Sequence, residues 1–287
     1  MISGCDVWKD DALGRGPVRV QWLGTAGFAL EHEGVVVLLD PYFTRASLGR
    51  CVVAPLRSDP AAVARYAPRA DAIVVGHTHF DHALDVPAIA IATGATVFGS
   101  RSAATLCRAS GVPEACVRDV ERAPGTEPIV AEVGPFRLRF VPSAHSRFFF
   151  GKVPFAGEIA DCDDVPLRTE AYRCGAVFAV EIQVAGRTIV HLGSAELAAT
   201  PFEAKEPELV LLCTAGWTSS PDLPERVARA LSPQAVLLSH WDDFFRPLDR
   251  GARMLPAMAV PRLVDRLAGA TREAKIGALP LLGEVWV

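Results

Sequence analysis

Short apolar runs, rich in β-branched residues, recur along the chain and are typical of buried strands. Turn-forming pairs such as Glu33-Gly34 and Ala185-Gly186 separate some of them, and helix-like segments separate others. The pattern recurs in the two halves, which favours an α/β protein of two similar units packed sheet against sheet. The predicted strands are residues 18–23, 28–31, 35–39, 72–76, 95–98, 129–133, 136–141, 176–184, 187–192, 209–213 and 235–239, and the predicted helices are 60–66, 83–90, 102–109 and 223–231.

Length and composition indicate an ordinary globular protein. Of 287 residues, 50% are hydrophobic and 22% are charged, so a core of this size needs no disulfides. We expect an N-terminal tail at residues 1–16 and a single domain at 17–287. The net charge of -4 gives no reason to expect nucleic acid, and no apolar run is long enough to span a bilayer. The expected partner is a small-molecule substrate, and the oligomeric state stays open.

Cysteine usage bears on location. The seven cysteines show no Cys-x-x-Cys pairing, which argues against a cysteine-rich zinc site. Free thiols are typical of a reducing compartment, so we expect a cytoplasmic protein. The sequence Ile2-Ser3-Gly4-Cys5 is similar to the lipid-attachment box of bacterial lipoproteins. A lipid anchor at Cys5 is therefore the alternative, if an upstream signal segment has been trimmed.

The strongest chemical signal is a stretch with four metal-binding side chains in six residues, His77-Thr78-His79-Phe80-Asp81-His82. It lies where a predicted strand ends and a helix begins. Residues two apart in an extended loop point the same way, so His77, His79 and Asp81 can converge. Imidazoles and a carboxylate suit zinc, manganese or iron. The spacing favours a metal site over an ordinary polar loop.

Other histidines are placed by the same reasoning. His145 follows the predicted strand at 136–141, as His77 follows its own strand, and His240 directly follows the strand at 235–239. His191 lies within a strand, where a packed core histidine is expected.

With these motifs the chain resembles the metallo-β-lactamase superfamily, whose signature is His-x-His-x-Asp-His. Residues 22–28 (Trp-Leu-Gly-Thr-Ala-Gly-Phe) and 36–41 are similar to the opening of the branch that holds L-ascorbate-6-phosphate lactonase and N-acyl-phosphatidylethanolamine phospholipase D. His145 and His240 match the later ligand motifs. The resemblance covers roughly residues 17–250. It implies a four-layer αββα sandwich, with two mixed β-sheets flanked by helices and all ligands on one edge between the sheets.

The resemblance also implies two metal sites. The first set would be His77, His79 and His145, and the second Asp81, His82 and His240. Zinc is the expected metal, with manganese and iron as alternatives.

One departure from the family pattern concerns the second metal. The family normally carries a metal-bridging aspartate where this chain has Ser194, a poor neutral ligand. We therefore expect one tightly bound metal and a weaker second one, with Glu196 as the first substitute to consider. Asp40 is placed near the site, where it either orients a ligand histidine or closes a turn.

These features lead to a hypothesis of metal-dependent hydrolysis. A metal bound by neutral imidazoles lowers the pKa of bound water from 15.7 to about 7. The resulting metal-bound hydroxide would attack an ester, lactone or phosphodiester, with Asp81 and His240 as catalytic residues and Asp81 orienting the water or receiving its proton. A metal-binding protein with little turnover and an iron-dependent redox protein are the alternatives. Residues 146–175, with aromatics at 148–150, are expected to form a lid or pocket wall.

Overall fold

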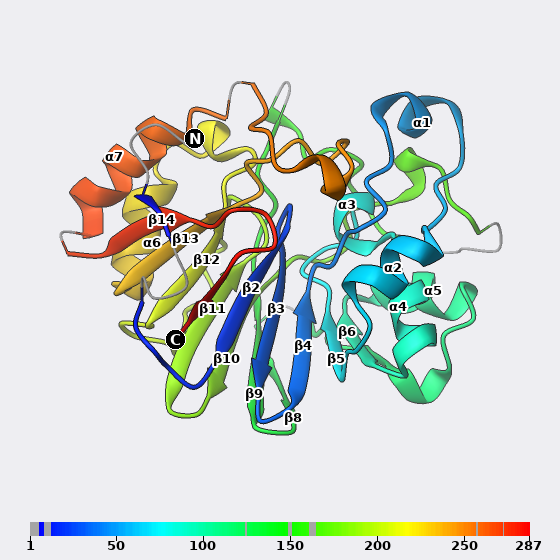
Figure 1. Ribbon diagram of the computed structural model, residues 1–287, viewed down its shortest axis with the longest axis horizontal. Helices are drawn as coiled ribbons and strands as arrows, with labels where there is room; N and C mark the ends of the chain where they lie inside the picture. The colour runs from blue at the N-terminus through cyan, green and yellow to red at the C-terminus, as the bar shows by residue number, and fades with distance from the viewer. Residues whose placement is uncertain are drawn as a thin grey trace.

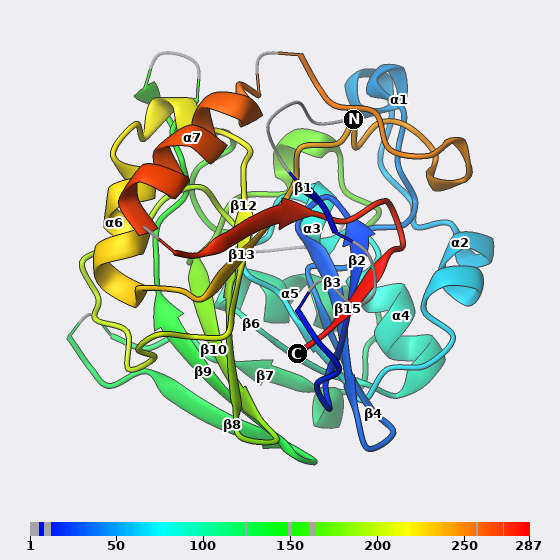
Figure 2. The same ribbon diagram turned by 60° about the vertical axis from the view of Figure 1, so that its left-hand side comes forward.

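The computed structural model describes residues 6–8, 13–123, 125–148, 151–160, 165–256, 258–271 and 273–287. Two β-sheets pack face to face, and helices cover their outer faces (Figures 1 and 2). In spatial order, one sheet runs β1 (Asp6–Val7), β14 (Lys275–Ala278), β13 (Ala235–Ser239), β12 (Leu209–Cys213), β11 (Arg187–Leu192), β10 (Phe178–Val184), β9 (Phe136–Pro142) and β8 (Ile129–Val133). The other runs β15 (Glu284–Trp286), β2 (Arg19–Gly24), β3 (Gly27–His32), β4 (Val35–Leu39), β5 (Ala72–Val74), β6 (Thr96–Gly99) and β7 (Val117–Asp119).

Both sheets contain parallel and antiparallel pairs, so the predicted four-layer αββα sandwich of mixed sheets is confirmed. The helices are α1 (Leu48–Val53), α2 (Pro60–Tyr66), α3 (Phe80–Ala83), α4 (Val86–Thr93), α5 (Arg101–Ala109), α6 (Leu223–Leu231) and α7 (Val260–Thr271). Helices α6 and α7 lie over the first sheet, and α2, α4 and α5 lie over the second (Figure 1).

Side-chain alternation along the strands builds the layers. On β4, Val37 and Leu39 join a hydrophobic cluster shared with the facing sheet, whereas Val36 and Leu38 join a cluster shared with α2, α4 and α5. Successive side chains of a strand point to opposite faces of its sheet. A strand that contributes to both clusters therefore needs an apolar residue at nearly every position. This requirement explains why the central strands appear in the sequence as continuous apolar runs.

Most predicted elements are present, and the differences have local causes. Helix α2 has the predicted bounds, since Asp59 caps its first turn and Pro60 opens it. The helix predicted at 83–90 is instead two helices, α3 and α4, because Pro87 has no N–H to donate to the carbonyl of Ala83 and is accommodated in the first turn of a new helix. Helix α1 lies in a stretch expected to be a loop. The patterns also assigned no element to β7, α7, β14 or β15.

Part of the expected N-terminal tail belongs to the sandwich. Strand β1 pairs in parallel with β14, and the buried Trp8 donates its backbone N–H to the carbonyl of Ala278 at 3.0 Å. Gly277 makes room for this indole, because a Cβ there would lie 2.0 Å from Trp8 Nε1. Cys5, residues 149–150 and the acidic stretch at 161–164 lie outside the described residues.

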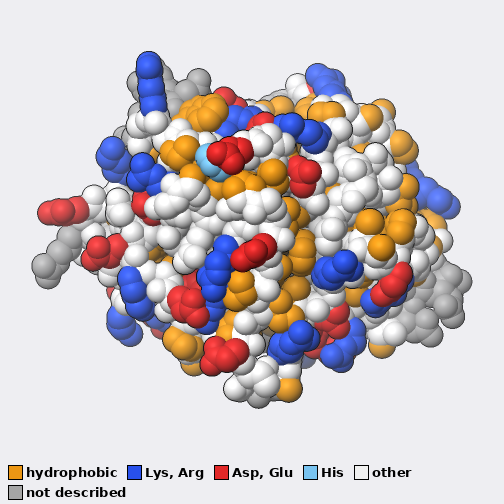
Figure 3. Space-filling model, turned by 90° about the horizontal axis from the view of Figure 1, so that it is seen from below, with side chains coloured by type: hydrophobic (Ala, Val, Ile, Leu, Met, Phe, Trp, Pro, Cys, Tyr) orange, Lys and Arg blue, Asp and Glu red, His pale blue; other side chains and the backbone are white. Residues whose placement is uncertain are grey.

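The surface gives two further facts. The face seen from below, at the end of the sandwich that holds the β3–β4 turn, intersperses acidic and basic side chains rather than presenting a field of one sign (Figure 3). Among the described residues, no helix is long and apolar enough to cross a membrane.

Asp85, buried between α3 and α4, ties the loop before α1 to the rest of the fold. Its Oδ2 accepts hydrogen bonds from the backbone N–H groups of Phe43 at 2.6 Å and Thr44 at 2.8 Å. Its Oδ1 accepts from the hydroxyls of Ser58, at 2.6 Å, and Thr44. Burial raises the pKa of the Asp85 carboxyl in spite of these bonds. This one side chain therefore satisfies two backbone donors that belong to a distant segment.

We predict that Asp85→Ala lowers the free energy of unfolding by about 2–4 kcal/mol, because it leaves those donors without an acceptor. Asp85→Asn keeps one acceptor oxygen and should cost less. Urea denaturation measures both, with Asp59→Ala, an exposed helix cap worth about 1 kcal/mol, as the control. Wild-type stability in Asp85→Ala would show that the hydrogen bonds of Asp85 do not stabilise the fold.

Candidate metal centre

The predicted ligands lie in three segments that directly follow strands β5, β9 and β13. These segments meet at one edge of the sandwich. His77 and His79 lie in the loop after β5, and Asp81 and His82 lie in α3. His145 follows β9 and His240 follows β13. The ring centroid of His77 lies 4.7 Å from that of His145 and 3.8 Å from that of His82. The ring centroids of His82 and His240 are 5.4 Å apart. All six predicted side chains therefore meet, although they span more than half of the chain.

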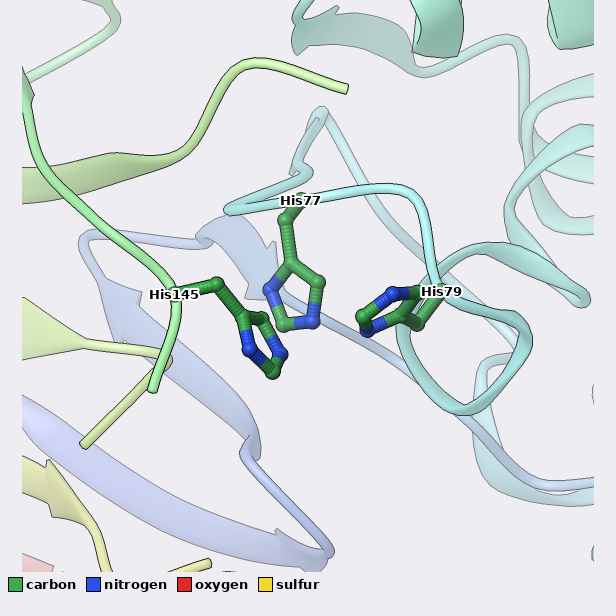
Figure 4. A group of neighbouring side chains, drawn as sticks. All are labelled: His77, His79 and His145. Carbon is green, nitrogen blue, oxygen red and sulfur yellow. The ribbon is translucent and has the colours of Figure 1, made fainter. Parts of the chain in front are cut away.

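His77, His79 and His145 form the first group. One ring nitrogen of each lies within 4.8 Å of the others, and their rings converge from two separate segments (Figure 4). His79 Nε2 lies 2.8 Å from the carbonyl of Pro154, and His145 Nδ1 lies 2.6 Å from the carbonyl of Ser146. A carbonyl can only accept, so these contacts place the hydrogen on that nitrogen and leave the other ring nitrogen as an electron-pair donor.

The lowered pKa values of these three rings favour their neutral, metal-binding form. Burial lowers the pKa of His77 well below its usual value, and the neighbouring histidines lower it further. Burial also lowers the pKa of His79, and burial together with His79 lowers the pKa of His145 to about 3. Neutral imidazole is the form that binds a metal.

Asp81, His82 and His240 form the second group, again with donor atoms within 4.8 Å of one another. His240 Nε2 lies 3.1 Å from Asp81 Oδ2, and His82 Nε2 lies 4.0 Å from the same oxygen. Burial opposes ionisation of Asp81, but His82 and His240 outweigh it and hold the pKa of the carboxyl well below its usual value. The second group thus offers an ionised carboxylate beside two imidazoles.

Asp40 stands behind this group, as the sequence suggested. Its Oδ2 lies 3.0 Å from His82 Nδ1, so the other nitrogen of His82 is left for the site. Burial opposes protonation of His82, but Asp40 and Asp81 outweigh it and raise the pKa of the imidazole. Gly193 permits the close approach of Asp40, since a Cβ there would lie 2.4 Å from Oδ2.

The donor set fits a bound metal. Both nitrogens of His77, and Nδ1 of His240, are buried without a hydrogen-bond partner among the residues that the structure describes. A buried polar group without a partner costs about 1–3 kcal/mol, so a cation bound to His77 would offset that cost. Three neutral imidazoles, with a carboxylate and two further imidazoles beside them, match the preferences of zinc, manganese and iron.

Three further polar residues considered for the site, Ser194, Glu196 and His191, have hydrogen-bond partners of their own. Ser194 Oγ accepts a hydrogen bond at 3.1 Å from the backbone N–H of Ser146, the residue after His145. The carboxylate of Glu196, the first residue considered as a substitute for the aspartate, accepts from Ser220 Oγ at 2.5 Å and Arg226 Nη1 at 2.5 Å. His191 is a packed core histidine, as predicted, with Nε2 3.0 Å from the carbonyl of Ala26.

A buried network of Thr25, Arg45 and Asp242, called the bracket below, holds the backbone of His240. The sequence analysis did not predict it. The backbone N–H of His240 donates to the carbonyl of Thr25 at 2.8 Å, and Thr25 N–H donates to Asp242 Oδ1 at 2.9 Å. Asp242 Oδ2 pairs with Arg45 Nη1 at 2.7 Å, and both side chains are almost fully buried. His240, Thr25 and Arg45 all have a positive φ, a conformation that persists only where surrounding contacts enforce it. No spacing in the sequence connects these residues, so only the fold shows the bracket.

Comparison with known proteins agrees with this geometry. The family described as "Beta-lactamase superfamily domain" matches residues 19–240. A metal-dependent hydrolase of Anaeromyxobacter sp. (strain K) is 26% identical over 239 residues, which cover 80% of this chain and 77% of the relative. A metal-dependent hydrolase of Myxococcus xanthus is 27% identical over 248 residues, covering 84% and 75%.

Solved structures share the fold at low identity. Igni18, a metallo hydrolase from Ignicoccus hospitalis, has a TM-score of 0.58 at 17% identity, covering 93% of this chain and 97% of that one. CmlA, a diiron β-hydroxylase from Streptomyces venezuelae, has a TM-score of 0.57 at 14% identity, covering 94% and 53%. An isothiocyanate hydrolase from Delia radicum gut bacteria has a TM-score of 0.53 at 16% identity, covering 93% and 97%.

The bracket behind His240 yields a stability prediction. Arg45→Met should lower the free energy of unfolding by about 3–5 kcal/mol, because it leaves the Asp242 carboxylate buried and unpaired. Adding Asp242→Asn should restore part of the loss, since the amide oxygen can still accept from Thr25.

Chemical denaturation of the two single variants and the double variant measures the coupling. Arg69→Met, which removes a surface ion pair with Glu31, is the matched control and should cost at most about 1 kcal/mol. Strictly additive losses in Arg45→Met and Asp242→Asn would argue against the bracket.

Proposed function

Because the chain belongs to the beta-lactamase superfamily, whose domain family matches residues 19–240, we propose that its two converging groups of side chains form the reaction centre of a metal-dependent hydrolase. The observation that carries this proposal is the convergence of His77, His79 and His145 within 4.8 Å. These three would hold the first metal, and Asp81, His82 and His240 would hold a second. Zinc is the expected metal, with manganese and iron as alternatives.

The chemistry divides between the metal and the chain. A metal held by neutral imidazoles lowers the pKa of coordinated water to about 7 and polarises a carbonyl or phosphoryl oxygen. Asp81 remains ionised, so it can orient a water molecule or receive its proton. His240 holds the Asp81 carboxylate at 3.1 Å, and Asp40 fixes the orientation of His82 from behind. The proposed reaction is hydrolysis of an ester, lactone or phosphodiester in a small-molecule substrate.

Two measurements separate this function from its alternatives. Elemental analysis of the purified protein distinguishes iron from zinc or manganese. A panel of lactone, ester and phosphodiester substrates then distinguishes a hydrolase from a metal-binding protein without turnover.

One test of the proposed function concerns the metal that His77, His79 and His145 would hold. His77→Ala combined with His79→Ala should remove bound metal and reduce hydrolysis to the uncatalysed rate, since two of three neutral ligands are lost. The fold should persist, because its core does not depend on a metal. Elemental analysis, turnover and circular dichroism test this, with His32→Ala, a histidine of β3 that belongs to neither group of ligands, as the control. Wild-type turnover in a metal-free double variant would contradict the proposal.

A further test concerns the number of metals that each chain binds. Wild type should retain one metal after dialysis and lose most of a second, because Ser194 supplies no charge between the two sites. Ser194→Asp should raise retention of the second metal, since it adds an anionic oxygen donor. Glu196→Gln should change neither, because Glu196 is bonded to Ser220 and Arg226. Two metals per chain in dialysed wild type would overturn this expectation.

A further inference from the structure

Three phenylalanines, two from the loop after β9 and one from the segment after β13, each lie beside a different histidine of the candidate metal centre. The ring centroid of Phe155 lies 6.3 Å from that of His79, edge to face. Phe148 lies 6.1 Å from His145, and Phe244 lies 5.4 Å from His240, edge to face. Each of these histidines therefore has an aromatic ring next to it.

Core packing does not explain two of these rings. Among the described residues, Phe148 and Phe155 belong to neither hydrophobic cluster of the fold. Phe155 is 39% exposed, and its φ of +41° is a genuine outlier for a bulky side chain. Both the exposure of an apolar ring to water and the positive φ of its backbone cost free energy. Backbone strain of this kind is found most often at functional sites.

Backbone hydrogen bonds nevertheless hold these rings in place. The carbonyl of Phe155 accepts from Cys174 N–H at 2.9 Å, and the preceding carbonyl, that of Pro154, faces His79. The N–H of Phe148 donates to the carbonyl of Lys152 at 2.9 Å. Gly216 leaves room for the Phe148 ring, because a Cβ there would lie 2.9 Å from its Cζ. These contacts fix the backbone positions of Phe148 and Phe155 beside the site.

Phe244 lies beside the other group of the site, next to His240. Its ring packs 4.4 Å from Phe245 and 6.2 Å from the buried Phe80, so it is backed by the cluster under the second sheet. A ring supported by the core, together with a partly exposed ring beside the same site, can contact an apolar group of a bound substrate.

We propose that Phe148, Phe155 and Phe244 form an apolar specificity wall, and that the substrate carries an aryl or alkyl group beside the bond that is cleaved. This inference rests on the proposed hydrolase function and names its substrate class. Binding such a group removes apolar surface of Phe155 from water, which favours apolar substrates over small polar ones.

Matched ligands test the wall without requiring turnover. Zinc-loaded protein is titrated by calorimetry with phenylphosphonate and with methylphosphonate, which differ only in the apolar group. Wild type should bind phenylphosphonate at least about tenfold more tightly. Phe148→Ala and Phe155→Ala should each bring the ratio closer to one, while methylphosphonate affinity stays within about twofold. Val130→Ala, an exposed apolar residue on β8, is the control and should leave the ratio unchanged.

Phe155→Gly separates a specificity role from a structural one. Glycine suits the positive φ of this position, so the thermal midpoint should match or exceed that of wild type while the phosphonate ratio falls. A lowered midpoint would indicate that Phe155 acts as a structural cover, and would overturn its assignment to the wall.

A kinetic comparison keeps the two proposals distinguishable. Turnover of p-nitrophenyl hexanoate should exceed that of the acetate in kcat/KM, and Phe155→Ala should reduce this preference. Ester hydrolysis without preference, together with equal phosphonate affinities, would reject the wall and leave the hydrolase standing. A phosphonate ratio that depends on the phenylalanines, without hydrolysis of any substrate, would support the wall and reject the hydrolase. Failure of phenylphosphonate to bind would also reject the wall.

Discussion

The site depends on the burial of two carboxylates among histidines at one edge of the sandwich. Asp40 lies 3.0 Å from His82, and Asp81 lies 3.1 Å from His240. Burying a carboxylate is costly unless it is paired or bound to a metal, so both groups must be held where cationic partners can reach them. The sandwich meets this condition because β5, β9 and β13 all end at the same edge. A slip of one residue at any of these ends would turn a ligand towards the core.

Sequence reasoning recovered the parts of the site that local patterns encode. The spacing from His77 to His82, and the position of His145 directly after a strand, were visible because strand periodicity fixes which side chains leave the sheet together. The central strands and α2 were visible for the same reason. The fate of Glu196 was not, because only the folded chain brings Ser220 and Arg226 to its carboxylate.

Long-range contacts between residues outside the recognised motifs were not predicted. The bracket of Thr25, Arg45 and Asp242 joins residues up to 217 positions apart, and neither Arg45 nor Asp242 differs in its local sequence from a surface charge. Strand β1 is short and depends on β14, near the other end of the chain, for its hydrogen bonds. Such features acquire their meaning from the fold, which is why periodicity and spacing do not predict them.

The shared fold and the individual rim carry different information. Structures with TM-scores of 0.58 and 0.53 retain the sandwich at 17% and 16% identity, so the architecture tolerates extensive sequence change. The loops above such a scaffold are where specificity is usually set. Here the loop after β9 carries Phe148 and Phe155, and the segment after β13 carries Phe244. The same two segments supply His145 and His240, which couples the shape of the rim directly to the position of the ligands.

The most direct test of the account is the location of metal in crystals of the protein, measured by anomalous scattering at the absorption edge of the metal found by elemental analysis. The account predicts its strongest peak within about 2.0–2.2 Å of one nitrogen each of His77, His79 and His145. A crystal that takes up no metal at these three histidines, or that binds it elsewhere, would contradict the claim that the buried histidines form a metal centre.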